Sequence, residues 1–197
     1  MCEIVIHCKE FFKLSTHVNM LIEALSKVDK IYWGDGSIFA KQNKKEDAVK
    51  YAERVFAYEL YHQFRSLMTD DCGYYLNGEI KKDNEIFEWE MNQNCYPDLV
   101  LHGNLYEIED GSQYFLCEIK MAHNPYLLDD LDKLARLSDS NLGFQDYISL
   151  CIGISKTELK EKIDNQRRDN RKFNNETLCI CRKDNVIDVF KLGDIIS

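Results

Sequence analysis

The sequence predicts an α/β protein in which a mixed β-sheet carries helices on both faces. Strand-like segments with alternating apolar residues follow a long amphipathic helix, and further helical segments follow the strands. Residues 147–154 form a nearly continuous apolar run, which is typical of a strand buried on both faces of a parallel or mixed sheet. The 197 residues are 45% hydrophobic, so the chain can bury a sizeable core.

Helical periodicity marks four segments. Apolar residues recur at helical spacing over residues 15–28 and, more strongly, over 47–68. Residues 127–137 repeat leucine at the same spacing, and the pattern of 157–173 indicates a polar helix. Either Ser155 or Thr157 could cap the polar helix at its N-terminus.

Strand signals lie between and after these helices. The predicted strands are 74–76, 86–91, 96–102, 114–120 and 147–154, followed by a closing hairpin of 178–181 and 186–190. Residues 109–112 contain Asp-Gly, a common turn signal, so we expect 96–102 and 114–120 to pair as a hairpin.

Charged side chains interrupt the two strands of this hairpin. Side chains alternate between the faces of a strand, so Glu118 and Lys120 share one face, and Asp98 shares a face with Val100. The remaining apolar side chains of both strands would pack against a core from the opposite face. Two carboxylates and an ammonium group on adjacent strands are costly to bury unless a divalent cation compensates them. The pattern therefore predicts a metal site.

Composition limits the classes of partner and the cellular setting. The formal net charge of −9 argues against a general nucleic-acid coat protein, although it does not exclude a nuclease with a local basic patch. Residues 156–172 are locally basic and fit a solvated helix face and a phosphate-contacting face equally well. No apolar run reaches the length of a membrane span, and the N-terminus lacks the pattern of a secretory signal. We therefore expect a cytoplasmic protein with no membrane partner.

The cysteines fit a core better than a zinc site. Four of the eight lie inside apolar strand-like runs, and no Cys-x-x-Cys pair is present. Cys179 and Cys181 would place both sulfurs on one face of a strand. We expect buried thiols.

A family resemblance rests on Pro97-Asp98 followed by Glu118-Ile119-Lys120 in this order of helix, strands and helix. These motifs resemble those of the PD-(D/E)XK nuclease superfamily, which has the restriction-endonuclease-like fold. The segment 130–134 (Asp-Leu-Asp-Lys-Leu) is similar to the helix that follows Glu-x-Lys in several bacterial members. The resemblance covers residues 48–155 and implies a mixed-sheet core of order αβββαβ flanked by helices.

The resemblance also implies roles for individual residues. Asp98 and Glu118 would bind Mg²⁺, for which Mn²⁺ can substitute, and Lys120 would orient or deprotonate the attacking water and stabilise charge on the phosphate. The family often adds a glutamate from the preceding helix to the metal ligands, and here Glu53 is preferred over Glu59 for that role. His102 shares a face with Asp98 and fits a hydrogen-bonded strand histidine better than a member of the site.

The implied function is a Mg²⁺-dependent nuclease that hydrolyses phosphodiester bonds. DNA is preferred to RNA as the expected substrate, and the choice between them stays open. The alternative is a catalytically inactive module of the same fold that binds protein or nucleic acid. We expect residues 1–47 to form an N-terminal helical extension and 48–197 to form the nuclease-like domain. A homodimer or a protein partner, endonuclease or exonuclease action and sequence specificity stay open.

Overall fold

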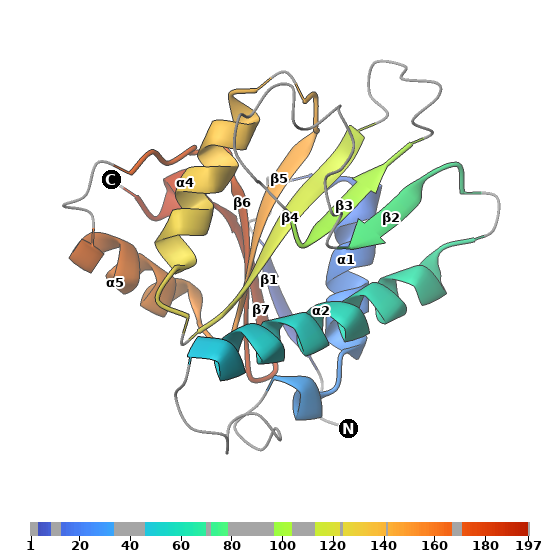
Figure 1. Cartoon of the computed structure of the whole chain (residues 1–197), viewed down its shortest axis with the longest axis horizontal. Helices are drawn as coiled ribbons and strands as arrows, with labels where there is room; N and C mark the ends of the chain where they lie inside the picture. Colours follow the sequence, from blue (N-terminus) through green and yellow to red (C-terminus); the bar gives the residue numbers. More distant parts are fainter. Residues whose placement is uncertain are drawn as a thin grey trace.

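One mixed β-sheet forms the centre of the computed structural model (Figure 1). The structure describes residues 4–8, 13–33, 46–69, 72–78, 97–103, 113–122, 124–140, 142–166 and 171–196, with the side chains of 46–52 and 166 excepted. Within these ranges the sheet has seven strands in the order β1-β7-β6-β5-β4-β3-β2. Four α-helices flank it, which confirms the predicted α/β class with a mixed sheet.

Apart from the strand Val5–Cys8, which was not predicted, and the helix expected over 157–173, the element bounds lie within a few residues of the predicted segments. The strands are β1 (Val5–Cys8), β2 (Tyr75–Gly78), β3 (Leu99–His102), β4 (Gln113–Met121), β5 (Asp146–Ile152), β6 (Leu178–Lys183) and β7 (Val186–Lys191). The α-helices are α1 (Thr16–Lys27), α2 (Glu46–Leu67), α4 (Leu127–Ser138) and α5 (Lys156–Gln166), and two short 3₁₀ helices are η1 (Lys30–Tyr32) and η2 (Leu192–Asp194).

The connections make the sheet mixed. Strands β2, β3 and β4 pair antiparallel, whereas β4, β5 and β6 run parallel to one another. Helix α4 connects β4 to β5, and α5 lies between β5 and β6 in the chain, as parallel neighbours require. Strands β6 and β7 close the chain as the predicted antiparallel hairpin. Of the residues expected to form an N-terminal extension, β1 pairs parallel with β7 in this same sheet.

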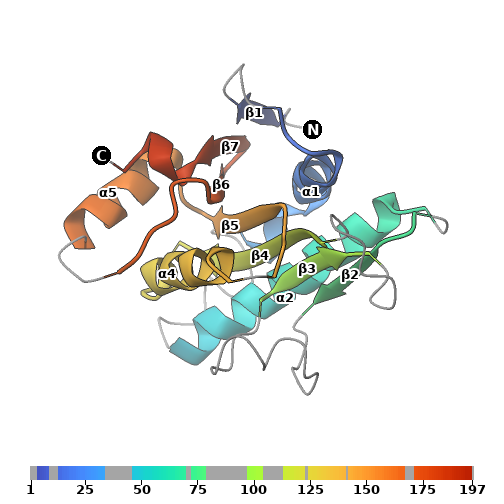
Figure 2. The same ribbon diagram turned by 90° about the horizontal axis from the view of Figure 1, so that it is seen from above.

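Helices cover both faces of the sheet (Figure 2). Helices α1 and α2 pack on one face, where their apolar stripes join the inward side chains of β3 and β4 in the largest core cluster. Leu99, Leu101, Phe115, Cys117 and Ile119 all lie in this cluster, as the alternation predicted. Helices α4 and α5 pack on the other face, against two smaller clusters. The face that carries Val100 and Leu116 is therefore also buried.

Local signals explain where two helices begin. The Ser15 side chain accepts a hydrogen bond from the N–H of Val18 at 3.2 Å and caps α1. Ser155 caps α5: its Oγ accepts from the N–H of Glu158 at 3.3 Å, while the Glu158 carboxylate accepts from the N–H of Ser155 at 2.8 Å. Of the two caps considered from the sequence, the structure uses Ser155.

Two sequence-based predictions have other outcomes. The helix expected over 157–173 is too long, because residues 171–173 are not helical and run beside α4. There Arg171 Nε donates to Asp129 Oδ1 at 2.9 Å, and the N–H of Lys172 donates to Asp132 Oδ1 at 2.7 Å. The strand expected at 86–91 and the turn at 109–112 lie outside the described residues.

The described cysteines are free thiols. Cys117, Cys151, Cys179 and Cys181 are fully buried, which confirms the prediction of core thiols. No helix in the described ranges has the length and apolar character needed to cross a membrane.

Candidate functional site

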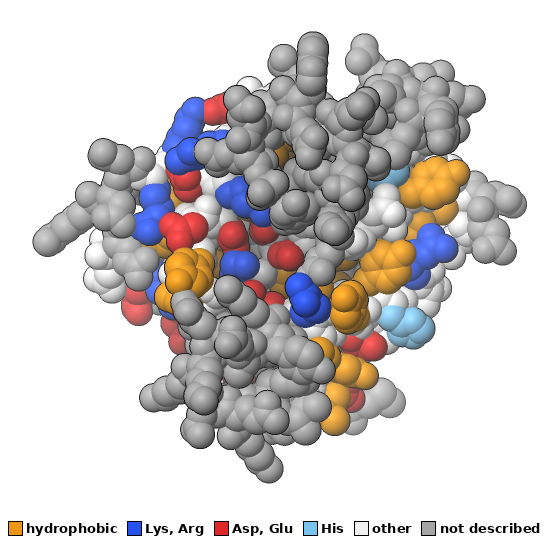
Figure 3. Space-filling model, viewed as in Figure 1, with side chains coloured by type: hydrophobic (Ala, Val, Ile, Leu, Met, Phe, Trp, Pro, Cys, Tyr) orange, Lys and Arg blue, Asp and Glu red, His pale blue; other side chains and the backbone are white. Residues whose placement is uncertain are grey.

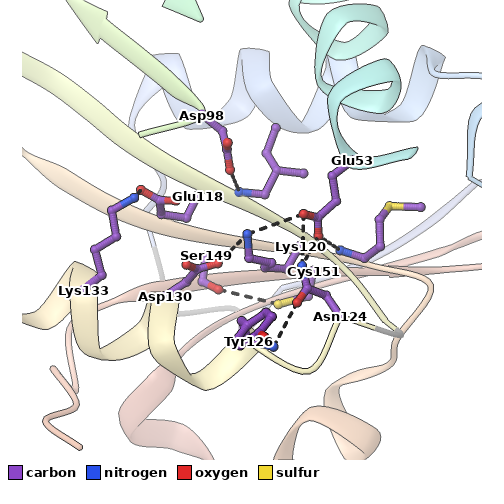
Figure 4. Close-up of polar contacts among 12 residues, drawn as sticks. Glu53, Asp98, Glu118, Lys120, Asn124, Tyr126, Asp130, Lys133, Ser149 and Cys151 are labelled. Atoms are coloured by element: carbon purple, nitrogen blue, oxygen red, sulfur yellow. Dashed lines mark hydrogen bonds and ion pairs between the residues drawn. The ribbon is translucent and has the colours of Figure 1, made fainter. Parts of the chain in front are cut away.

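Strands β3 and β4 bring Asp98 and Glu118 side by side. Leu99 pairs with Cys117, so the residue before Leu99 and the residue after Cys117 are neighbours. Both carboxylates lie near Lys120, two residues further along β4 (Figure 4). The structure thus brings together the three residues on which the sequence-based site rests.

Asp98 is held against the backbone of β4. Its Oδ2 accepts a hydrogen bond from the N–H of Ile119 at 2.6 Å. Burial raises the pKa of Asp98, while the Ile119 N–H and the charge of Lys120 act to lower it. The net shift is upward, so the site does not fully compensate this negative charge.

Glu118 is the most deeply buried carboxylate of the group, with a side chain 3% exposed. Lys133 of α4 lies above it, with Nζ 2.5 Å from Glu118 Oε1. Burial and then the charge of Asp98 raise the pKa of Glu118 to about 8, although Lys133 opposes the shift. At neutral pH this carboxyl group therefore carries a proton for much of the time.

Lys120 lies between two other carboxylates. Its Nζ is 2.9 Å from Asp130 Oδ2 on α4 and 3.5 Å from Glu53 Oε1 on α2. Burial acts to lower the pKa of Lys120, but the charges of Asp130, Glu53 and Asp98 outweigh it and raise the pKa. Lys120 is therefore a firmly protonated cation.

Glu53 reaches this cluster from α2 and is fixed there by hydrogen bonds. Its Oε2 accepts from the N–H of Met121 at 3.1 Å and from Asn124 Nδ2 at 2.8 Å. Asn124 is itself held, because its Oδ1 accepts from the N–H of Tyr126 at 2.9 Å. Glu59, the other glutamate considered, instead accepts from Gln63 on its own helix at 2.7 Å. Of the two, Glu53 is the one that meets Lys120.

His102 is a hydrogen-bonded strand histidine, as predicted. Its Nδ1 lies 2.6 Å from the carbonyl oxygen of Gly103, which can only accept, so Nδ1 carries the proton. Nε2 then accepts from Asn77 Nδ2 at 2.5 Å. Both ring nitrogens are used within the fold.

The donor set suits a hard cation in part. Asp98 and Glu118 offer carboxylate oxygens, which Mg²⁺ and Mn²⁺ prefer, and their raised pKa values show that the ionised groups lack stabilisation that a cation would supply. The oxygens of Glu53 are already used by Met121, Asn124 and Lys120. Among the described residues, no three His, Cys, Asp or Glu side chains converge as metal ligands. Asp98 and Glu118 are the two carboxylates that could hold a metal ion, with Lys133 Nζ lying 2.5 Å from Glu118 Oε1.

A cavity opens beside Asp98. It has a volume of about 250 Å³ and lies between α2 and the strands β2 and β3. In Figure 3 acidic and basic side chains are interleaved near the middle of this face, and hydrophobic side chains continue to the right of them. Asp98 and Leu99 line the cavity from the start of β3.

Three members of the cluster had no role assigned from the sequence: Asn124, Asp130 and Lys133. Asp130 and Lys133 are three residues apart in the predicted leucine-rich helix, so they lie on one side of it. This spacing was the available signal. The spacing could not predict that α4 packs over β4 so that Asp130 contacts Lys120 and Lys133 contacts Glu118.

Three lysines in the described part of the locally basic segment make contacts within the fold. Lys160 Nζ donates to the carbonyl oxygen of Ile195 at 2.9 Å, and Lys162 Nζ donates to that of Ala122 at 2.7 Å. Lys156 lies over the ring of Phe190. These contacts favour a structural use of the three lysines over a phosphate-contacting one.

Comparison with known proteins adds no relative. The chain matches no family model, no curated protein and no solved structure. The residues of the site and their geometry therefore carry the functional argument.

Proposed function

We propose that this chain is a Mg²⁺-dependent nuclease that hydrolyses phosphodiester bonds, with DNA preferred to RNA as the proposed substrate. The observation that carries the proposal is the pair of buried carboxylates, Asp98 and Glu118, whose pKa values are both raised beside the protonated Lys120. The order α2-β2-β3-β4-α4-β5 supports it, since it is the order implied by the resemblance to the PD-(D/E)XK superfamily.

Asp98 and Glu118 are the residues that would hold the metal ion. When bound, Mg²⁺ would polarise a phosphate oxygen and lower the pKa of its water. Glu118 has to release its proton to serve as a ligand, because its pKa is about 8. We therefore expect metal binding to strengthen as the pH rises toward 8.

Lys120 fits charge stabilisation better than base catalysis. Its raised pKa keeps the ammonium group protonated, and a protonated amine cannot accept a proton from water. It can donate hydrogen bonds to the phosphate and offset negative charge that develops on it. Of the two roles implied by the resemblance, the raised pKa favours this one.

Glu53 and Asp130 position Lys120 in this proposal. Both carboxylates lie within 3.5 Å of Nζ, one from each face of the sheet. Glu53 could join the metal ligands only by giving up a hydrogen bond to Met121 or Asn124. We therefore assign it to the placement of Lys120 and treat a ligand role as secondary.

A second function, a catalytically inactive binding module, has one observation in its favour. The cluster supplies its own cations, because Lys133 lies 2.5 Å from Glu118 and Lys120 lies 2.9 Å from Asp130. Such internal ion pairs can hold a former metal site together without a metal. This alternative predicts a folded protein that neither binds Mn²⁺ nor cleaves nucleic acid.

Cleavage assays separate the two functions. Plasmid DNA, single-stranded DNA and RNA are incubated with the protein in Mg²⁺, in Mn²⁺ and in EDTA. We expect metal-dependent cleavage that falls about 100-fold or more in Asp98→Ala and in Lys120→Ala. Glu59→Gln is the matched control on α2, and it should cleave like the parent because Glu59 bonds only within its helix among the described residues.

Circular dichroism has to show that each variant is folded. A parent protein that cleaves none of these substrates, or a folded Lys120→Ala variant that cleaves at the parental rate, would contradict the proposal.

A further inference from the structure

The cavity beside Asp98 has a wall that the proposed chemistry does not use. Arg54, Tyr58 and Tyr61 line it from α2, and Asn77 and Gly78 line it from β2. Positions 54, 58 and 61 are spaced four and three residues apart, so helical geometry places them on one side of α2. One helix face thus presents two aromatic rings and a guanidinium group next to a proposed metal ligand.

The inner part of the cavity is fixed in shape. The hydroxyl group of Tyr61 donates to the carbonyl oxygen of Leu76 at 3.2 Å, which holds the ring against β2. Gly78 faces this ring: a Cβ atom built on Gly78 would lie 3.6 Å from Tyr61 Cδ2. The glycine therefore leaves space over the ring that any other residue would fill.

The rim of the cavity carries an unusually exposed aromatic ring. The side chain of Tyr58 is 60% exposed, more than any other large hydrophobic side chain in the described ranges. A tyrosine offers a large flat surface at a low cost in conformational entropy, which suits it to contacts with a planar ligand. Its exposure indicates that this surface is available in the free protein.

Asn77 stands behind this wall of the cavity. Its neighbours Leu76 and Gly78 face α2, so the Asn77 side chain points to the other face of β2. There its amide nitrogen donates to His102 Nε2, because His102 Nδ1 must donate to Gly103. This contact ties β2, and with it the wall of the cavity, to β3.

The charge of the protein points to the same kind of ligand. Duplex binding relies on neutralising many phosphates, which a chain of net charge −9 does poorly. Proteins that bind single strands gain much of their affinity from bases stacked on aromatic side chains. An aromatic cavity beside the site is what such binding requires.

We propose that the cavity between α2 and β2 binds an unstacked nucleobase of a single-stranded nucleic acid, stacked on Tyr58, so that the adjoining phosphodiester lies at Asp98. This inference rests on the proposed nuclease function and gives it a substrate class. Arg54, at the same wall, would contact the neighbouring phosphate or the plane of the base.

Binding of a fluorescein-labelled oligothymidylate, measured by fluorescence anisotropy in EDTA, tests the proposal apart from cleavage. We expect Tyr58→Leu to weaken binding about tenfold and Tyr58→Phe to keep it, since the ring and not the hydroxyl group does the stacking. Gly78→Val should also weaken binding, because its side chain would fill the cavity. Arg54→Gln should weaken it more than Arg65→Gln, which removes the same charge from an exposed site elsewhere on α2.

The outcomes separate this inference from the proposed function. Tyr58-dependent binding of the single strand, with weaker binding of a matched duplex, would support the proposed base-binding cavity. If the protein binds in this way but shows no metal-dependent cleavage, the nuclease function is contradicted and the cavity is not. Metal-dependent cleavage of single strands at an unchanged kcat/KM in a folded Tyr58→Leu variant would overturn the cavity and leave the nuclease standing. Tighter binding of the duplex than of the single strand would also overturn the cavity.

Discussion

The same face of the sheet is charged on β4 and uncharged on the next two strands. Glu118 pairs in register with Ser149, which pairs with Cys179. One step along the strands, Lys120 pairs with Cys151, which pairs with Cys181. Two rows of side chains thus run from a carboxylate and an ammonium group to buried thiols, under helices α4 and α5.

The contrast shows that burial under these helices does not require charge. The thiols pack with leucine and isoleucine side chains of α4 and α5 in one core cluster, where burial alone stabilises the fold. On β4 the same position in the layers holds ions, which are costly to remove from water. Packing alone therefore does not account for the charges on β4.

The largest expected effect comes from removing the ammonium group of Lys120 on β4. Lys120→Met keeps the length of the side chain but leaves Glu53 and Asp130 without the ammonium group they share. We expect the free energy of unfolding to fall by about 3 kcal/mol, because a buried carboxylate without its partner is strongly destabilising. Urea denaturation at pH 7 measures the change.

A compensating variant sharpens this comparison. Adding Glu53→Gln and Asp130→Asn to Lys120→Met removes the uncompensated charge and should recover most of the lost stability. A Lys120→Met variant as stable as the parent would show that these ion pairs do not stabilise the charged part of β4.

A smaller effect is expected from the proton on Glu118. Its pKa is raised from 4.5 to about 8 in the folded protein, so the folded state binds more protons than the unfolded state between these values. Stability from this group therefore falls as the pH rises from about 5 to 8. Glu118→Gln cannot ionise, and its gain in stability over the parent should grow across that interval.

Urea denaturation at pH 5 and pH 8, with Glu59→Gln as the control, measures this difference. Addition of Mg²⁺ at pH 8 should stabilise the parent and leave Glu118→Gln nearly unchanged. An equal pH dependence in parent and variant would mean that Glu118 ionises normally in the fold.

The smallest effect is expected at the buried thiols of β5 and β6. Cys179→Ala removes one buried sulfur and should lower the free energy of unfolding by about 1 kcal/mol at any pH from 5 to 8. The pKa of Cys179 is raised well above its usual value by burial, so the thiol does not ionise in this range. A strongly pH-dependent effect in this variant would contradict the contrast between β4 and the next two strands.

Much of the fold could be predicted from local sequence signals. The leucine spacing of α4, the stripe of α2 and the alternation on β3 and β4 each reflect burial on one side, and burial is what the pattern of apolar residues records. That Asp98 and Glu118 lie on adjacent strands could be predicted from the expected hairpin, but their register could not, because it depends on an irregularity between Leu101 and His102. The helix between β4 and β5 then allows these two strands to pair in parallel.

The partners of the charged residues could not be predicted in the same way. Whether Asp130 or Asp132 of α4 meets Lys120 depends on the rotation of the helix over the sheet, which the packing of its leucines decides. The predicted end of α5 was wrong because Arg171 and Lys172 contact α4, a long-range interaction with no local signal.

The most direct test of the central claim is calorimetric titration of Mn²⁺ into the parent protein and into Asp98→Ala at pH 8, with cleavage of single-stranded DNA followed in the same samples. We expect the parent to bind the metal and to cleave, and the folded Asp98→Ala variant to do neither. Equal metal binding by both proteins, or no binding by the parent, would contradict a metal site built on Asp98 and Glu118.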